Sequence, residues 1–394
     1  MLWEERDRTM TEWTALDEWG PWPTPRQELL LRASLLSGVD ALDAWEDWKS
    51  EAEIDRVAMP SMSLLPLLYH NLLNHGIVDP LMEDLKKRYV ATWYSNQILL
   101  KRISGLLSRF AASGIPSILL KGAAMTIAYY KDYGVRPMGD VDVLVRREDA
   151  VRASVLLGES GFYPATPTSP MVMRYMHGAH FVDERGFAVD LHWRLLWEVD
   201  TPEVEADLWN NSRATATGDA STRVLDPTHQ LFHVLVHGAR WNSAPLRWVA
   251  DAVTITNTRS DEVDFERIAA IAGASGLHLP VAQALRYLGG TWSVQVSETI
   301  LASLEAIPTS RIDRAKHRYL ARNRKHLLLG NLPMHVFHFR RFTRGMGPLR
   351  RLAELPRFLA FTWRLGRIRD LPVLILAKAG RRVGVALRSL FGDG

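Results

Sequence analysis

The spacing of apolar residues divides the chain into helical and extended stretches. From residue 26 to residue 107 the apolar positions recur at helical intervals, which predicts an all-helical N-terminal unit over residues 1–112. Its last helix is predicted over residues 83–112. Gly114 and Pro116 then stop the helix and favour an extended chain.

Shorter apolar runs follow and predict a small mixed sheet between about Pro116 and Trp193. The predicted strands cover residues 117–120, 141–145, 180–183 and 187–193. The last two strands form a hairpin that turns at Gly186. This sheet lies within a predicted core of residues 113–215.

Helical spacing returns after Asp226, where Thr228 is expected to cap a strong helix. The pattern predicts a second helical unit over residues 216–330. Prolines then divide residues 331–394 into short predicted helices. The fold class expected from these elements is α+β, with a small mixed sheet flanked by helical N-terminal and C-terminal units.

Composition narrows the class of protein. With 47% apolar and 23% charged residues the chain is expected to be globular. The absence of cysteine excludes disulfide scaffolds, thiolate metal sites and cysteine nucleophiles, so any metal must bind oxygen or imidazole. No apolar run of about 18 residues occurs, and the acidic, tryptophan-rich start does not resemble a secretory signal. We therefore expect a cytoplasmic location. Core packing is the expected role of the N-terminal tryptophans, with an exposed interaction surface as the alternative.

The net charge of +4 conceals an uneven distribution. Residues 320–394 hold 16 Lys and Arg against 3 Asp and Glu, while the rest of the chain holds 32 against 41. Arginines alternate with Leu, Phe and Trp in this basic region, and residues 371–391 could form an amphipathic helix. The pattern of residues 332–394 indicates peripheral contact with anionic membrane or with nucleic acid. Packing on the protein's own acidic body is the alternative.

Two carboxylates on a predicted strand are the main candidates for chemistry. Asp140 and Asp142 are two residues apart, so both side chains leave the same face of the strand. Gly139 allows close backbone approach beside them, and Asp190 ends another predicted strand. A solvated strand end would explain an isolated Asp-x-Asp pair. Three carboxylates on one face, however, can hold two Mg²⁺ or Mn²⁺ ions for an in-line phosphoryl or nucleotidyl displacement.

These residues resemble the polymerase-beta-like nucleotidyltransferases, and in particular their bacterial uncharacterised branch with a Leu-Lys-Gly motif. The matching segments, which follow the family's order, are Leu120-Lys121-Gly122, Tyr129-Tyr130, Arg136-Pro137-Met138-Gly139-Asp140-Val141-Asp142-Val143-Leu144-Val145 and Val189-Asp190-Leu191-His192-Trp193. The resemblance extends over most of the chain.

The resemblance implies roles for single residues. Asp140, Asp142 and Asp190 would be the metal ligands and the catalytic residues, and Asp190 would help orient or deprotonate the attacking hydroxyl. The triphosphate would lie near Lys121 and Gly122. Most of the superfamily has Gly-Ser at this turn, and here Lys121 could supply positive charge directly.

Further residues are candidates for contacts with the nucleotide, the substrate or the metal. Arg136 and Gly139 are predicted to bind the nucleotide, although Arg136 could equally form a structural salt bridge with carboxylates. His180 and His192 could contact substrate or metal. Three histidines recur at every fourth residue of a predicted helix, which favours a row of polar side chains along one helix face over a zinc site. These three are His229, His233 and His237.

The activity expected from these residues is Mg²⁺-dependent transfer of a nucleoside monophosphate from an NTP to an unidentified acceptor, with release of pyrophosphate. A small molecule, a peptide, a protein and RNA are all possible acceptors. One alternative is a catalytically inactive adaptor that keeps the fold and docks on membrane or nucleic acid through its basic C-terminal region. Another is phosphohydrolase or kinase activity. Asp142→Asn is expected to leave thermal stability intact or raised, because it relieves carboxylate repulsion.

Overall fold

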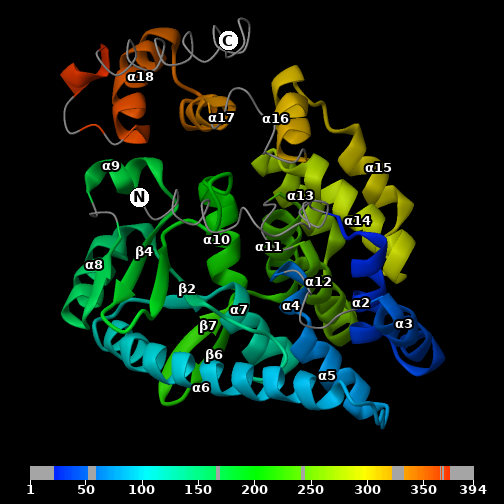
Figure 1. The fold of residues 1–394 in the computed structure, drawn as a ribbon. Coiled ribbons are helices and arrows are strands. Elements are labelled where there is room, and N and C mark those ends of the chain that lie inside the picture. Colours follow the sequence, from blue (N-terminus) through cyan, green and yellow to red (C-terminus); the bar gives the residue numbers. More distant parts are fainter. Residues whose placement is uncertain are drawn as a thin grey trace, which may run out of the picture. The chain divides into compact units, whose positions relative to one another are not determined.

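The computed structural model describes residues 22–51, 59–165, 169–240, 245–321, 332–363, 365 and 368–372. Within these residues the fold is α+β, as the sequence predicts, with helices before and after a mixed sheet (Figure 1). The N-terminal helices are α2 Pro25–Leu35, α3 Gly38–Glu51, α4 Met59–Met62, α5 Leu65–Asn74 and α6 Met82–Ala112. At the N-terminus of α2 the Thr24 hydroxyl accepts a hydrogen bond from the Gln27 amide, and the Gln27 side chain accepts one from the Thr24 amide. This reciprocal pair is a capping box.

The sheet has seven strands in the order β3-β4-β5-β2-β1-β7-β6. Their bounds are β1 Ser117–Leu119, β2 Asp140–Val145, β3 Phe162–Pro164, β4 Gly178–Asp183, β5 Ala188–His192, β6 Arg213–Thr217 and β7 Ala220–Val224. β2 pairs with β5, and β1 with β7, in parallel, and the other pairs are antiparallel. The predicted strands are confirmed. The sheet extends beyond the expected end at Trp193, because the β6–β7 hairpin adds to the edge of β1.

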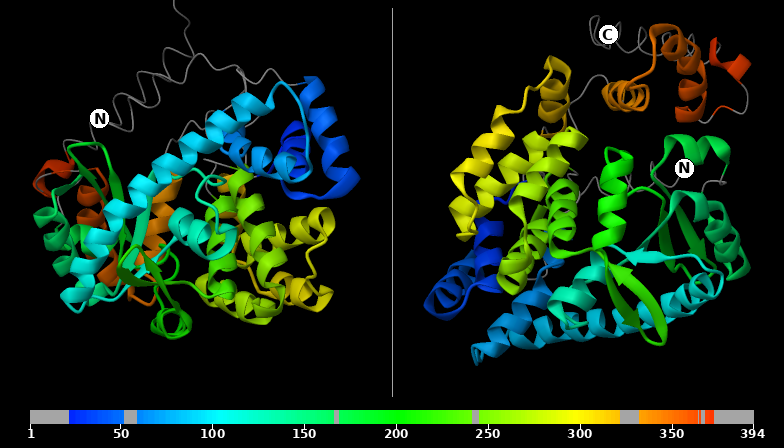
Figure 2. Two further views of the ribbon diagram at one scale, coloured as in Figure 1. Left: turned by 90° about the horizontal axis from the view of Figure 1, so that it is seen from below. Right: turned by 180° about the vertical axis from the view of Figure 1, so that it is seen from behind.

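Helices α6 and α8 (Ala150–Glu159) contact each other and the strands, so they cover the same face of the sheet (Figures 1 and 2). The 3-10 turn Arg147–Asp149 leads into α8. A short helix, α7 Lys121–Met125, continues as a π-helical turn over Thr126–Tyr130 and packs beside β2. The chain therefore changes from strand to helix directly at Lys121.

Helices also follow the sheet, as predicted. They are α11 Pro227–Arg240, α12 Pro245–Arg259, α13 Phe265–Ser275, α14 His278–Trp292, α15 Glu298–Ala306 and α16 Arg311–Ala321, with a 3-10 turn at Ser260–Glu262. One further helix, α10 Pro202–Asn211, lies between β5 and β6. The expected cap of α11 is wrong. The Asp226 carboxylate, and not the Thr228 hydroxyl, accepts from the first amides of the helix, because Asp226 precedes Pro227 and can reach the amides of Thr228 and His229.

The main apolar core joins the N-terminal helices to the helices after the sheet. Trp45 and Trp48 stack with ring centroids 5.8 Å apart and are almost wholly buried. Trp22 packs edge-on against Trp248 of α12. These three rings confirm core packing, whereas the three earlier tryptophans lie outside the described residues. The N-terminal helices thus hold α12, which carries part of the site described below.

The chain divides into two compact units. The smaller unit comprises residues 168–176 and 327–394, and its described helices are α9 Pro170–Tyr175, α17 Leu332–Phe342, α18 Pro348–Thr362 and the 3-10 turn Ile368–Asp370. Tyr175 packs against aromatic rings of α17 and α18 and donates to buried Glu354. The predicted helix over residues 371–391 falls almost entirely outside the described residues. In the described parts of the chain, no helix combines the length and apolarity needed to cross a membrane.

Candidate metal and nucleotide site

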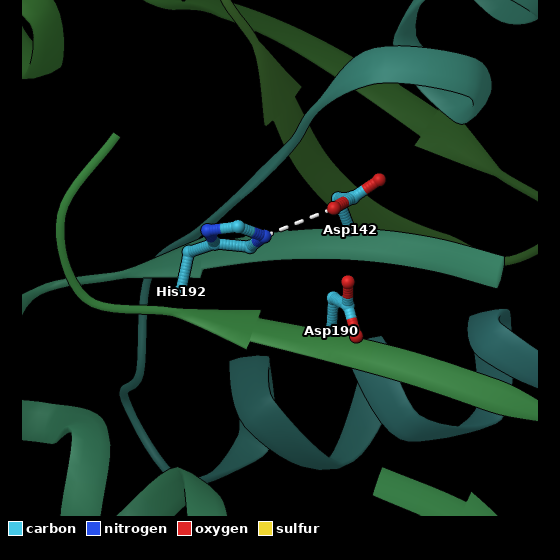
Figure 3. A group of neighbouring side chains, drawn as sticks. All are labelled: Asp142, Asp190 and His192. Carbon is cyan, nitrogen blue, oxygen red and sulfur yellow. Dashed lines mark hydrogen bonds and ion pairs between the residues drawn. The ribbon is translucent and has the colours of Figure 1, made fainter. Parts of the chain in front are cut away.

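The pairing of β2 with β5 places the predicted acidic residues side by side. These strands run parallel, with Asp142 opposite Asp190 and Leu144 opposite His192. Because side chains alternate along a strand, Asp140, Asp142, Asp190 and His192 all belong to one face of the sheet. Figure 3 shows the Asp142 and Asp190 side chains rising from neighbouring strands with His192 beside them.

Asp142, Asp190 and His192 form a close group. One ligand atom from each lies within 4.8 Å of the others, and among the described residues no other set of three potential ligands comes this close. His192 Nε2 lies 2.9 Å from Asp142 Oδ1 (Figure 3). On the neighbouring strand β4, His180 Nδ1 lies 2.5 Å from Asp190 Oδ1. Both predicted histidines thus contact the predicted carboxylates, His192 buried and His180 about half exposed.

Lys121 reaches the same group from the turn after β1. Its ammonium lies 2.5 Å from Asp142 Oδ1, and the preceding Leu120 amide donates to the Asp142 carbonyl. The backbone of Lys121 has a left-handed φ of 43°, which a residue with a Cβ adopts only at an energetic cost. This strained turn aims the side chain at Asp142.

The two aspartates of β2 differ in electrostatics. Burial alone would raise the pKa of Asp142, but Lys121 and His192 bring it well below the ordinary value. Burial raises the pKa of Asp140, and the negative charges of Asp142 and Asp190 raise it further. The expectation that Asp142→Asn relieves repulsion is therefore wrong, because Asp142 is the residue that Lys121 and His192 stabilise. That expectation suits Asp140.

The donor set fits a divalent cation. In the described structure only the Oδ1 atoms of Asp142 and Asp190 take part in hydrogen bonds, which leaves each Oδ2 and both oxygens of Asp140 available as ligands. The pKa of Lys121 is lowered by burial but raised overall by the three carboxylates, so the group remains a cation. Three carboxylates beside one ammonium leave excess negative charge, and hard oxygen ligands suit Mg²⁺ or Mn²⁺.

Arg136 is buried and pairs with a carboxylate that lies outside the predicted acidic set. Its Nε and Nη2 donate to Asp251 of α12 at 2.9 and 2.8 Å, and the Tyr130 hydroxyl donates to the same carboxylate at 3.0 Å. The salt-bridge alternative for Arg136 is therefore present, with Asp251 as its partner. Asp251 comes from a helix more than a hundred residues later in the sequence, so spacing on the strand gave no signal of it.

The two glycines predicted to bind nucleotide differ in their surroundings. A Cβ on Gly122 would lie 2.7 Å from Arg136 Nη1 and 2.8 Å from Met138 Cγ, so only glycine fits between α7 and this segment. A Cβ on Gly139 would meet nothing within 4 Å. Gly122 therefore has a packing role of its own, and the backbone beside Gly139 is open to a ligand.

A third histidine contributes to the electrostatics of the site. His233 of α11 is buried, and burial together with the charge of Lys121 lowers its pKa to about 3. Among the described residues its Nε2 has no hydrogen-bond partner. His229, one turn earlier, pairs with Asp226. The helical histidine spacing indicated a polar stripe, but it could not show that His233 is buried near Lys121.

Carboxylates clustered on the neighbouring strands β2 and β5 of a mixed sheet agree with the arrangement expected of a nucleotidyltransferase. The sequence model of the uncharacterised nucleotidyltransferase family matches residues 56–291. The chain belongs to this family. No curated protein matches the sequence. Among solved structures, an antigenic nucleotidyltransferase-like protein from Paracoccidioides brasiliensis matches with 14% identity and a TM-score of 0.34, over 52% of this chain and 95% of that chain.

Proposed function

We propose that the protein transfers a nucleoside monophosphate from an NTP to an acceptor and releases pyrophosphate, in a reaction that requires Mg²⁺ or Mn²⁺. The observation that carries this proposal is the juxtaposition of Asp142 and Asp190 on parallel strands, with Asp140 two residues along. Membership of a nucleotidyltransferase family supports it. Asp140, Asp142 and Asp190 would hold the cation, which supplies positive charge to the triphosphate when bound.

In the proposed reaction an acceptor oxygen bonds to the α-phosphorus, the bond from the α-phosphorus to its bridging oxygen breaks, and pyrophosphate leaves. Asp190 would orient the attacking hydroxyl. Its neighbour His180 is about half exposed and lies 2.5 Å from Asp190 Oδ1, so this pair is placed to take up the proton that the hydroxyl loses. Lys121, Gly122, Arg136 and Gly139 would surround the phosphates.

The finer assignment to the bacterial branch with the Leu-Lys-Gly motif rests on the segment Leu120-Lys121-Gly122 and is part of this proposal. The left-handed backbone at Lys121 and the close packing of Gly122 give this motif a structural reason. The choice of NTP and the acceptor, whether a small molecule, a peptide, a protein or RNA, are to be determined by screening.

The first test is thermal shift of the wild type and of Asp140→Asn with each NTP, with and without Mg²⁺ or Mn²⁺. Asp140 is the right target because its removal leaves the Lys121–Asp142 pair intact. We expect stabilisation of the wild type only when nucleotide and metal are both present, and none for the variant. A second assay follows label from an α-labelled NTP into candidate acceptors together with pyrophosphate release.

The outcomes separate three functions. Label transfer with pyrophosphate release supports the nucleotidyltransferase, whereas release of inorganic phosphate or γ-phosphate transfer indicates a hydrolase or kinase. The absence of any metal-dependent shift and of any transfer rejects the proposal. That result would favour a binding protein in which the Lys121 ammonium, 2.5 Å from Asp142, neutralises the carboxylates in place of a metal.

A further inference from the structure

Arg247 is a cation without an ion-pair partner among the described residues. It is the third residue of α12, and no carboxylate in the described part of the chain forms an ion pair with it. Its Nε is buried and has no hydrogen-bond partner among the described residues. The nearby Asp251, four residues later on the same helix, already accepts from Arg136 and Tyr130. A buried guanidinium donor without an acceptor is costly, which points to a ligand that supplies one.

Three features of the fold disfavour a positive charge at this position. Burial lowers the pKa of Arg247, and the neighbouring charge of Arg136 lowers it further, to about 10. The side chain also stands in the first turn of a 15-residue helix, where the helix dipole repels cations and attracts anions. These effects would all be offset by an anion bound beside the guanidinium.

The surroundings of Arg247 connect it to the proposed nucleotide site. Asp140 lies close enough to act on the pKa of Arg247. Arg136 uses Nε and Nη2 for Asp251, and its remaining nitrogen, Nη1, lies against the position where a Cβ on Gly122 would stand, 2.7 Å away. The Arg247 guanidinium therefore lies near enough to Arg136 and to Asp140 of β2 for their charges to act on it.

We infer that Arg247, together with Arg136 Nη1 and the first amides of α12, binds the β- and γ-phosphates of the nucleotide. This inference rests on the proposed function for the identity of the ligand. The chemistry recognised is a linear polyphosphate, since its oxygens accept from several guanidinium and amide donors at once. Arg247 would then distinguish an NTP from an NMP, because the monophosphate lacks the groups that reach it.

The test is calorimetric titration of the full chain with inorganic tripolyphosphate, once with Mg²⁺ and once with EDTA. We expect Arg247→Gln to bind at least tenfold more weakly than the wild type, and Arg247→Lys, which keeps the charge but not the planar fork, to lie between them. Arg314→Gln removes the same charge from an exposed position of α16 and should bind like the wild type. Equal binding by Arg247→Gln and wild type, or no binding by the wild type, would overturn the inference.

A second readout excludes a merely structural role. In wild type we expect an NTP to bind more tightly than the matching NMP, and in Arg247→Gln this ratio should fall at least tenfold while the affinity for NMP stays unchanged. Equal weakening of both ligands contradicts the inference. If Arg247→Gln does not fold, the same ratio in Arg247→Lys decides, with at least a threefold fall expected. If tripolyphosphate binding depends on Arg247 but no nucleotidyl transfer occurs, only the proposed function is rejected. If nucleotidyl transfer occurs and does not depend on Arg247, only this inference is rejected.

Discussion

Asp140 and Asp142 look equivalent in the sequence but are opposite in their energetics. Asp142 is buried, and its Oδ1 contacts both Lys121 Nζ and His192 Nε2. Asp140 is partly exposed, and in the described structure its carboxylate accepts no hydrogen bond. A carboxylate whose pKa the fold lowers contributes stability, whereas one whose pKa the fold raises costs stability. The surrounding charges therefore stabilise Asp142 and on balance disfavour the charged form of Asp140.

This difference predicts that Asp142→Asn and Asp140→Asn have opposite effects on stability. Asp142→Asn should lower the free energy of unfolding by roughly 2 to 4 kcal/mol, because it leaves the Lys121 ammonium without its counterion. Asp140→Asn should leave stability unchanged or raise it by up to about 1 kcal/mol, because it removes repulsion. Urea unfolding in EDTA measures both. Equal destabilisation by the two variants would contradict the electrostatic assignment.

His233 predicts a pH dependence of stability. Its pKa is about 3 in the fold and about 6.5 in an unfolded chain, so both states are neutral above pH 6.5. Below pH 6.5 the unfolded chain takes up a proton that the folded chain does not, and stability falls as the pH falls. By linkage this costs about 2 kcal/mol at pH 5.

The measurement is the free energy of unfolding at pH 7 and at pH 5 for the wild type, His233→Gln and His70→Gln, all in EDTA. His233→Gln should lose less stability than the wild type over this interval. The control replaces the more exposed His70 and should retain the wild-type dependence. An unchanged pH dependence in His233→Gln would show that His233 accepts a proton in the folded state.

At the scale of elements, the site depends on how closely the strand-to-helix turn approaches the segment before β2. Gly122 of α7 stands against Arg136 and Met138 with no room for a Cβ, and Arg136 is in turn fixed by Asp251 of α12. The Arg136 guanidinium therefore links α7, the segment before β2, and α12. Movement of α7 would displace this guanidinium and the Lys121 side chain together.

Gly122→Ala should destabilise the protein by about 1 to 3 kcal/mol, because the added methyl group overlaps Arg136 Nη1 and Met138 Cγ. It should also weaken NTP binding by shifting Arg136. The matched control is Gly139→Ala, whose Cβ enters open space and should change stability by less than about 1 kcal/mol. Thermal melts of both variants test the effect on stability, and NTP titration of Gly122→Ala tests the effect on binding. Full stability of Gly122→Ala would argue against the close packing described.

At the scale of the whole molecule, the smaller unit combines a packed interior with a basic exterior. Tyr175 lies among Phe342, Phe358 and Phe361, and buried Glu354 pairs with Arg174. Leu349 and Leu352 of α18 are exposed on either side of the exposed Arg350 and Arg351. Exposed leucines beside basic side chains are typical of surfaces that bind anionic membranes, and basic side chains alone also bind nucleic acid.

Residues 371–394 add four basic residues to this basic region, and each contributes about 1 kcal/mol near an anionic surface, so their deletion should weaken binding to anionic liposomes or to RNA at least tenfold. Co-sedimentation and filter binding measure the two partners. Neutral liposomes and raised salt serve as controls, because the attraction is electrostatic. Unchanged binding after the deletion would show that residues 371–394 do not contact the liposomes or the RNA.

Local pattern alone determined much of this protein. Apolar spacing predicted α6, α11 and the strands that carry Asp140, Asp142 and Asp190, because helical and extended periodicities are properties of neighbouring residues. The alternation of side chains along a strand also placed the two aspartates of β2 on one face. The resemblance of the sequence motifs to nucleotidyltransferases agrees with the family to which the chain belongs. It gave no signal of the short strands β3, β6 and β7, which are held by pairing within the sheet.

Only the tertiary structure decided which groups balance one another's charge. The pairing register sets Asp142 against Asp190, the turn at Lys121 delivers an ammonium to Asp142, and α12 brings Asp251 to Arg136. These partners lie between 21 and 115 residues apart in the chain, so no local pattern encodes them. Charge interactions depend on distance and burial, which the fold alone fixes. The types of side chain at the site were therefore readable from the sequence, but their protonation and their partners were not.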